Sequence, residues 1–187
     1  MKNFKLLALF LTTSLVVTSC SNDDNAAVNE EELITTVSVT LQGGGQTIVL
    51  TSKDLDGIDG PNAPVFSTTG GDLVAGRTYT GSTTFLNEAK SPAEDITAEV
   101  EEEGADHQVF YQLASSLGTI TYTDNDENSK PIGLSFSLVT AASAATGNLS
   151  VTLKHLPNKS ASGVSNGDIT NAGGSTDVLV VFPITVN

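Results

Sequence analysis

The densest group of potential metal ligands in the chain lies at the end of a predicted helix. Glu99 and Glu103 are one helical turn apart, and Asp106 and His107 follow directly. One imidazole with two or more carboxylates is a ligand set that transition metals accept. His155, the second histidine, falls in register with a predicted strand and would strengthen the set if the fold brings it near His107. A solvated helix end is the alternative, because acidic runs usually face water.

A loop rich in oxygen atoms offers a second cation site. Asp54, Asp56, Asp59 and Asn62 lie in a segment that also contains glycine and proline. Carboxylate and amide oxygens are the ligands that calcium prefers. The EF-hand pattern is absent, because Ile58 stands where an oxygen ligand is needed and no bidentate glutamate follows. Since Asp and Gly are also common turn residues, a plain turn is the alternative.

Sequence motifs of common enzyme active sites are missing. The chain has no Gly-x-Ser-x-Gly nucleophile elbow, no phosphate-binding loop and no His-Glu-x-x-His zinc motif. It also has no tryptophan to stack on a sugar. Pairs of carboxylates are common in so acidic a chain, so their presence is no evidence of a catalytic acid and base. We therefore expect that the protein is not an enzyme.

Charge excludes further classes of function. The chain has 22 acidic and 8 basic residues, and its formal net charge is −14. Nucleic-acid binding requires lysine and arginine for phosphate contacts, so this charge argues against a nucleic-acid partner. It argues equally against adsorption to anionic lipid headgroups, and it favours solubility and the attraction of cations.

Residues 1–19 have the pattern of a signal peptide, with Lys2 and Lys5 ahead of an apolar run. This run is shorter than the roughly 20 residues that a transmembrane helix needs. It leads into Val-Thr-Ser-Cys20, which resembles the lipobox of bacterial lipoproteins, whose cysteine is acylated and becomes the mature N-terminus. Because Cys20 is the only cysteine, we expect it to carry the lipid that holds the protein at a membrane. A secreted protein with a cysteine there by chance is the alternative.

The residues after this cysteine predict where in the cell the protein is located. Ser21, Asn22, Asp23 and Asp24 resemble the signal that sends lipoproteins of the Bacteroidetes to the outer face of the outer membrane. We therefore expect a lipid-anchored protein of the cell surface, with residues 20–30 as a flexible acidic tether. The alternatives are an ordinary solvated linker and a location on the periplasmic face.

Residues 31–187 have the texture of an all-β domain, in which Thr, Ser, Gly and Asn punctuate short apolar runs. The spacing predicts an immunoglobulin-like two-sheet β-sandwich of about eight strands. Gly43–Gly45 predicts a hairpin turn. The last strand, apolar on both faces, is expected at the centre of a sheet with Pro183 near a bulge or an end. Strands are predicted near 33–41, 47–52, 65–69, 79–86, 107–113, 120–122, 132–138, 149–153 and 178–186.

One short crossover helix is predicted over residues 91–103. Ser91 has the side chain of an N-cap, Pro92 suits the first helical position, and Glu94 completes a capping box. Ala93, Ile96 and Val100 form a narrow apolar stripe. Gly104 is a natural C-terminal stop.

Five stretches, at 30–36, 62–64, 91–97, 105–108 and 167–174, together with the leader ending at Cys20, carry a wider similarity. They resemble a group of small lipoproteins from flavobacteria and related Bacteroidetes, often labelled type 1 periplasmic binding fold superfamily proteins. That label implies strands alternating with helices around a parallel sheet, whereas the strand pattern here predicts the sandwich. The resemblance implies an outer-membrane receptor as partner and transfers no catalytic residue.

Three functions are consistent with these patterns. The first is a surface binding module that captures a cation, a divalent metal ion among them, or a small nutrient complex for an outer-membrane transporter. The second is a structural or adhesive surface domain that contacts proteins or glycans through an exposed apolar patch. A hydrolase is a distant third. The distance between His107 and His155 is the observation that tests most directly whether a surface binding module could hold a metal ion.

Overall fold

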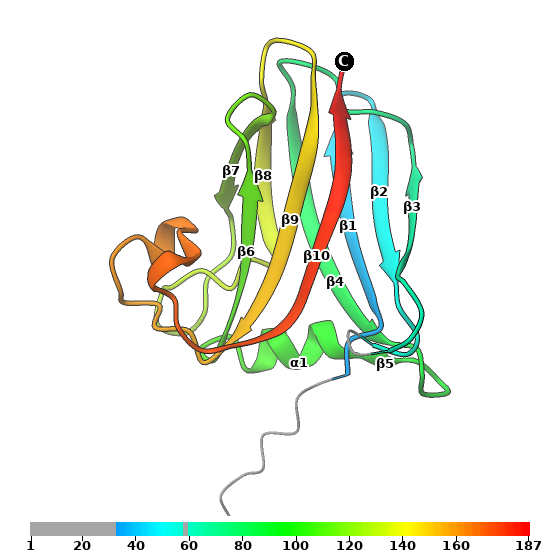
Figure 1. Ribbon diagram of the computed structural model, residues 1–187. Helices are drawn as coiled ribbons and strands as arrows, with labels where there is room; N and C mark the ends of the chain where they lie inside the picture. Colours follow the sequence, from blue (N-terminus) through cyan, green and yellow to red (C-terminus); the bar gives the residue numbers. More distant parts are fainter. Residues whose placement is uncertain (1–32, 58–59) are drawn as a thin grey trace, which may run out of the picture. The chain divides into compact units, whose positions relative to one another are not determined.

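Figure 1 shows a computed structural model that describes residues 33–57 and 60–187. These residues belong to the second of two compact units, Met1–Glu30 and Glu31–Asn187. The elements of the described part are β1 (Thr36–Gly43), β2 (Gln46–Lys53), β3 (Val65–Thr69), β4 (Thr78–Asn87), β5 (Glu94–Asp95), α1 (Ile96–Glu102), β6 (His107–Leu113), β7 (Gly118–Tyr122), β8 (Ser135–Thr140), β9 (Ala145–His155), the 3₁₀ turns η1 (Val164–Asn166) and η2 (Ile169–Asn171), and β10 (Ser175–Val186).

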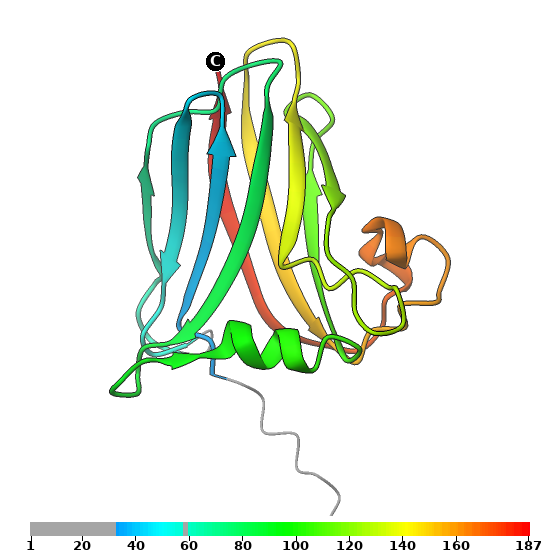
Figure 2. The same cartoon turned by 180° about the vertical axis from the view of Figure 1, so that it is seen from behind.

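The strands form two antiparallel sheets that face each other as a sandwich (Figures 1 and 2). In the described residues the wider sheet has seven strands, in the order β3-β2-β1-β4-β8-β7 with β5 beside β4. The narrower sheet has the order β10-β9-β6. The prediction of an all-β, two-sheet architecture is confirmed. The parallel sheet implied by the superfamily label is not what these residues form.

The hairpin predicted at the glycine run is confirmed. β1 and β2 pair along their full lengths, and the last pair of the ladder is Gly43 with Gln46. Gly44 and Gly45 form the two-residue turn, with φ angles of 59° and 82°. Both angles lie in the left-handed region, which residues with a Cβ adopt at a cost, so glycine suits both positions.

The alternation of residues along β4 builds the middle of the core. Tyr79, Gly81, Thr83 and Phe85 all point between the sheets and are buried. Phe136 of β8 packs directly over Gly81, and both Phe136 and Phe85 have no exposed surface. Burying each large apolar side chain contributes about 1.5–3 kcal/mol, so this face of β4 helps to hold the two sheets together.

β8 begins three residues later than the sequence pattern predicts. Gly133 has a φ of 88°, and its backbone N–H donates to the carboxylate of Asp124. Asp124 also accepts the backbone N–H of Ser135. These contacts interrupt the extended backbone, so the regular ladder starts only at Ser135.

The helix begins later than predicted, and its N-cap is a different residue. Asp95, not Ser91, caps α1 by accepting the backbone N–H of Thr97 at 3.0 Å. The capping box fails because Glu94 and Asp95 pair with β4 as β5, which keeps the backbone extended up to the cap. Ser91 precedes a cis peptide bond to Pro92. No helix among the described residues is long and apolar enough to cross a membrane.

The position predicted for the last strand is wrong. β10 lies at an edge of the narrower sheet, and β9 is its only neighbour among the described strands. The register shifts between Thr176 and Val178, so the bulge is there and not at Pro183. Both faces of β10 are apolar for a different reason: its even-numbered residues from Val178 onward enter the core, whereas Leu179 and Val181 are exposed on the outer face.

We predict that Gly81→Val strongly destabilises the sandwich. A Cβ on Gly81 would lie 2.2 Å from a ring carbon of Phe136, which is fully buried and cannot move freely. Overpacking of this kind costs about 1–3 kcal/mol of unfolding free energy, measurable by urea denaturation. Thr80→Ala, at the exposed neighbouring position, should change stability little, and Phe136→Leu should restore part of the loss in the double variant.

Candidate functional site

The wider sheet extends past the narrower one, and the part of its inner face left uncovered forms a groove. The groove has a volume of about 500 Å³. Residues from 33–37, 52–57, 62–66 and 177–181 line it, so it runs between β10 on one side and β1, β2 and β3 on the other. Figure 1 shows β2 and β3 displaced to the side of β10. We call this surface the β3–β10 groove.

Large apolar side chains form the walls and rim of the groove. Ile34 and Val37 belong to the core and are buried, whereas Leu33, Phe66 and Leu179 expose 45%, 46% and 50% of their surface at the rim. A group of exposed apolar side chains is typical of an interaction site. Sequence reasoning missed this surface, because no local pattern says that β3 and β10 lie at neighbouring sheet edges.

One end of the groove is acidic. Asp54, Asp56 and Asp177 line it, and no lysine or arginine is among the lining residues in the part of the chain that the structure describes. Partial burial and the neighbouring Asp56 raise the pKa of Asp54. Its Oδ1 atom is buried and accepts no hydrogen bond from the described residues. This end therefore favours a ligand that brings a positive charge or a hydrogen-bond donor.

The predicted calcium loop forms this end of the groove. Asp56 Oδ2 accepts two hydrogen bonds from Asn62, from the backbone N–H at 3.1 Å and from Nδ2 at 2.8 Å. The backbone N–H of Asn62 is the main cause that lowers the pKa of Asp56. Asp56 and Asn62 thus close a turn, as the alternative interpretation expects. Asp59, the fourth residue of the calcium prediction, lies outside the described residues.

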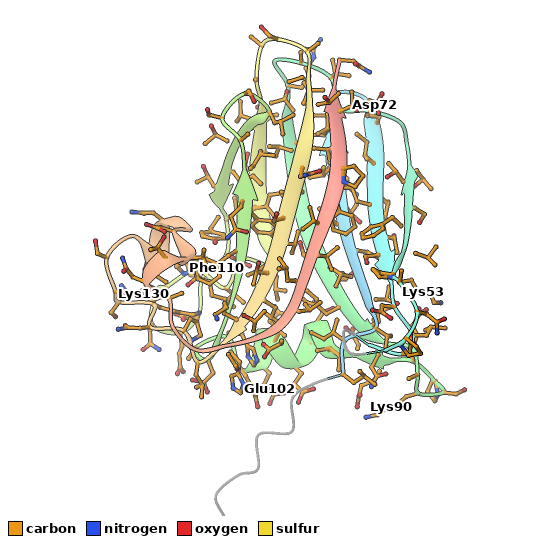
Figure 3. The ribbon with its side chains drawn as sticks, in the orientation of Figure 1. Lys53, Asp72, Lys90, Glu102, Phe110 and Lys130 are labelled. Atoms are coloured by element: carbon orange, nitrogen blue, oxygen red, sulfur yellow. The ribbon has the colours of Figure 1, made fainter. Side chains whose placement is uncertain are left out.

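A smaller cavity of about 240 Å³ continues along β10. Leu73, Pro183 and Ile184 are among its lining residues. Phe66, which lines the larger groove, meets the ring of Phe182 of β10 edge to face, with ring centroids 6.0 Å apart. Figure 3 shows Asp72, which also lines the smaller cavity, at the far end of the sandwich from Lys53.

The structure brings the two histidines of the metal prediction together. His107 begins β6, His155 ends β9, and the two residues are paired across the ladder. Their rings stack with centroids 4.7 Å apart and an angle of 12° between the ring planes. The lone pairs of an imidazole lie in the plane of its ring, so two rings stacked in this way do not point their nitrogens at one central ion.

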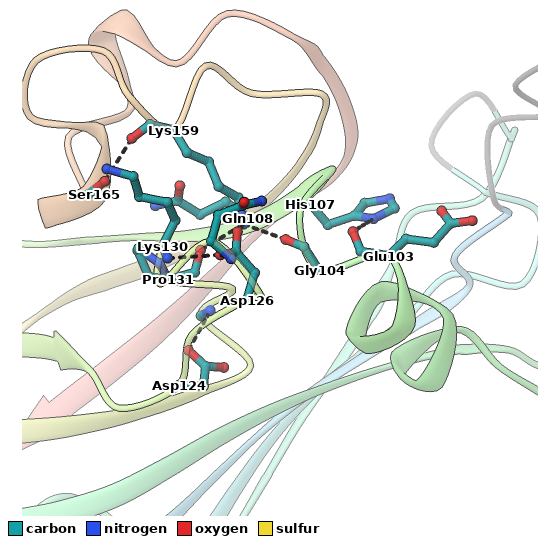
Figure 4. A network of polar contacts seen from close by, with 12 residues as sticks. Glu103, Gly104, His107, Gln108, Asp124, Asp126, Lys130, Pro131, Lys159 and Ser165 are labelled. Carbon is teal, nitrogen blue, oxygen red and sulfur yellow. Dashed lines mark hydrogen bonds and ion pairs between the residues drawn. The ribbon is translucent and has the colours of Figure 1, made fainter.

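The carboxylates of the metal prediction do not join the histidines. Glu103 contacts His107 through its backbone oxygen, which lies 3.2 Å from His107 Nδ1 (Figure 4). Asp106 likewise uses its backbone oxygen, which accepts the N–H of Leu156, and the backbone oxygen of Glu99 accepts the N–H of Glu103. Among the described residues no three His, Cys, Asp or Glu side chains come together as a metal site.

A buried lysine that sequence reasoning missed ties three loops together beside this pair. Lys159 Nζ donates to the backbone oxygens of Gly104 and Pro131 and to Asp126 Oδ2, the last at 2.9 Å (Figure 4). Burial lowers the pKa of Lys159, and Asp126 opposes this shift. Burial acts to raise the pKa of Asp126, but hydrogen bonds from Lys159 and Lys130 outweigh it and lower the pKa. Nothing in the local sequence marks Lys159 among the other basic residues.

The segment that Lys159 anchors covers the outer face of the narrower sheet. Phe110 points away from the main core and is fully buried in a second apolar cluster, with Val164 and Ala172 (Figure 3). Gln108 donates through Nε2 to the backbone oxygen of Val164 at 2.9 Å. This part of the outer face is therefore closed, whereas Leu179 and Val181 on β10 stay exposed.

Several predicted site residues lie outside the part of the chain that the structure describes. They are the lipidation residue Cys20 and the export residues Ser21, Asn22, Asp23 and Asp24. Comparison of the chain with protein-family models, with curated proteins and with solved structures finds no match.

We predict that Lys159→Met destabilises the protein by about 3–5 kcal/mol, because the loss of one partner leaves a buried carboxylate uncompensated. Denaturant unfolding at neutral pH measures this loss. The control is Lys154→Met: Lys154 Nζ bonds to Gly174 and Thr176 at the surface, so its removal should cost less than about 1 kcal/mol. Equal losses in the two variants would contradict the role given to Lys159.

Proposed function

We propose that this chain is a lipid-anchored binding module of the outer cell surface, built on an immunoglobulin-like sandwich, which takes its ligand in the β3–β10 groove. The observation that carries the proposal is an apolar groove with an exposed rim at Phe66 and Leu179 and carboxylates at one end, Asp54 among them. Such a groove suits a ligand that has an apolar body and a positive charge.

The proposed location at the outer membrane is supported by the sequence. The lipobox at Cys20 and the acidic residues Asp23 and Asp24 support acylation and transport to the outer face of the outer membrane, with the periplasmic face as the alternative. The resemblance to small lipoproteins of the Bacteroidetes supports the same address. It also supports an outer-membrane receptor or transporter as the partner to which a captured nutrient would pass.

An adhesive domain is the second candidate, and the exposed apolar rim favours it. Leu33, Phe66, Leu179 and Val181 are four large apolar side chains with at least 41% of their surface exposed. Contact with another protein would bury them. Both candidate functions use the same groove, so the first experiment establishes whether the groove binds a ligand.

We predict that dansylcadaverine, an apolar ring with a primary amine, binds the full-length Cys20→Ala chain, which lacks the acyl anchor. Fluorescence titration should give a weaker Kd for Phe66→Ala, because the ring forms part of the groove wall. Val65→Ala is the matched control, since Val65 is the neighbouring exposed residue of β3 and does not line the groove. Equal affinities of these two variants would remove the groove as the site.

A separate pair of variants measures how much negative charge contributes to binding of the probe. Asp54→Asn should weaken dansylcadaverine by about threefold to tenfold and leave neutral dansylamide unaffected. Glu127→Gln, at an exposed position in a different loop, controls for the general acidity of the protein. A loss of the same size with dansylamide would show that Asp54 acts through the folding of its loop and not through charge.

For the anchor, we predict that Cys20→Ala abolishes incorporation of an alkyne-labelled fatty acid and moves the protein from the membrane fraction to the soluble fraction. The physical reason is that anchoring depends on the burial of acyl chains, each methylene contributing about 0.8 kcal/mol. Fractionation of cells followed by immunoblotting measures the shift. Label that remains on the Cys20→Ala protein would contradict acylation at this residue.

A further inference from the structure

The hydrogen bonds at one end of β10 show which of its residues face the open edge. Leu73 donates its N–H to the oxygen of Thr185 at 3.0 Å, and Asn187 donates its N–H to the oxygen of Leu73 at 2.8 Å. The two bonds form a short parallel bridge between Leu73 and Val186. Since the backbone groups of successive strand residues point to opposite sides, the odd-numbered residues of β10 beyond Val178 face the open edge and the even-numbered ones face β9.

The open edge continues beyond this bridge along the groove. Pro183 has no N–H to offer, but Leu179 and Val181 have both an N–H and a carbonyl there, and no described residue hydrogen-bonds to them on that side. An unpaired strand edge of this kind is a template for the addition of another strand. The bridge at Leu73 shows that the edge already accepts one extended segment of the chain itself.

The groove lies directly beside this edge, and its residues 177–181 are the same stretch of β10. In a strand added to β10, alternate side chains would point into the groove and the others to solvent. The apolar walls at Val37 and Phe66 suit alternate apolar side chains. A strand opposite 177–183 would be about 20 Å long, that is, six or seven residues.

The negative charge at one end of the groove indicates which side chain the added strand should carry there. Asp54, Asp56 and Asp177 line the end of the groove where β10 begins, so a lysine or arginine at that end of the added strand would meet carboxylates. The chain's own tether is a poor occupant, because it carries Asp23, Asp24 and Glu30, is followed by two further glutamates, and would be repelled.

We propose that the β3–β10 groove receives an extended segment of a partner protein, which adds to the open edge of β10, places apolar side chains in the groove and sets a lysine or arginine against Asp54. This inference rests on the proposed binding function of the groove and names the class of its ligand. Main-chain hydrogen bonds to Leu179 and Val181 give the affinity, and the groove and its acidic end give the specificity.

The test uses two capped heptapeptides, Val-Thr-Val-Thr-Val-Thr-Lys and Lys-Thr-Val-Thr-Val-Thr-Val, which present lysine for the two possible strand directions. Calorimetric titration into the full-length Cys20→Ala chain should show that one of them binds. Replacing its lysine by norleucine should weaken binding to this chain, and this difference should disappear in Asp54→Asn. Failure of both peptides to bind overturns the proposal.

Backbone pairing is tested by methylating alternate amide nitrogens of the peptide that binds. Methylation of the set that faces β10 should abolish binding, and methylation of the other set should leave it unchanged. Equal effects of the two sets would overturn strand addition to a single edge.

The matching change in the protein is Val181→Pro, which removes the outward N–H and leaves the pairing with β9 intact, as Pro183 already does two residues further on. The peptide should lose about threefold to tenfold in affinity, the effect of one hydrogen bond. Val181→Thr, which keeps the N–H, is the control. Far-UV circular dichroism and the midpoint of urea denaturation of the two variants show whether both are folded.

The outcomes separate the two proposals. If dansylcadaverine binds in the groove and neither peptide binds, the strand-addition proposal fails and the proposed function stands. If the probe and the peptides all fail to bind the folded protein, both proposals fail. An unchanged peptide affinity in Val181→Pro overturns the role of the β10 edge.

Discussion

The unequal width of the two sheets determines where the core ends and where a partner can enter. Six strands side by side span about 24 Å between the outermost two, whereas three span about 10 Å. The narrower sheet therefore cannot cover the whole inner face of the wider one. At the centre, Phe85 and Phe136 are fully buried between the sheets, but beside β10 the groove opens, with Val37, Ser52 and Phe66 of β1, β2 and β3 among its lining residues. The β3–β10 groove is the direct consequence of this mismatch.

The molecule protects one side of the narrower sheet and leaves the other open. Next to β6, the segment with η1 and η2 buries Phe110, and the contacts of Lys159 with Asp126 and with two backbone oxygens hold that segment in place. A buried cation with several oxygen partners is costly to disturb, which makes this side rigid. On the β10 side, only the bridge at Leu73 and the proline at Pro183 limit access to the strand edge among the described residues. The narrower sheet is thus covered beside β6 and open beside β10, and this difference supports binding at β10.

Local patterns predicted the fold well, because alternation and turn chemistry are local properties. The hairpin at Gly43–Gly45, the inward face of β4 and the position of His155 at a strand end all followed from spacing. The start of α1 was missed because a tertiary contact, the pairing of β5 with β4, overrides the capping preference of Ser91. The site was largely missed for a similar reason. The acidic loop at Asp54 and Asp56 was singled out for calcium, but its place beside Phe66 and Leu179 depends on strand order, which no single segment encodes.

Amide hydrogen exchange along β10, followed by NMR with and without the basic heptapeptide that binds, tests the central claim most directly. In the chain alone, the amides of Val180 and Phe182, which face β9, should exchange slowly, whereas those of Leu179 and Val181 should exchange quickly. Saturation with the peptide should slow exchange at Leu179 and Val181 and change the other two little. Slow exchange at Leu179 and Val181 without peptide, or no change on saturation, would contradict the claim that β10 offers an open edge to a partner strand.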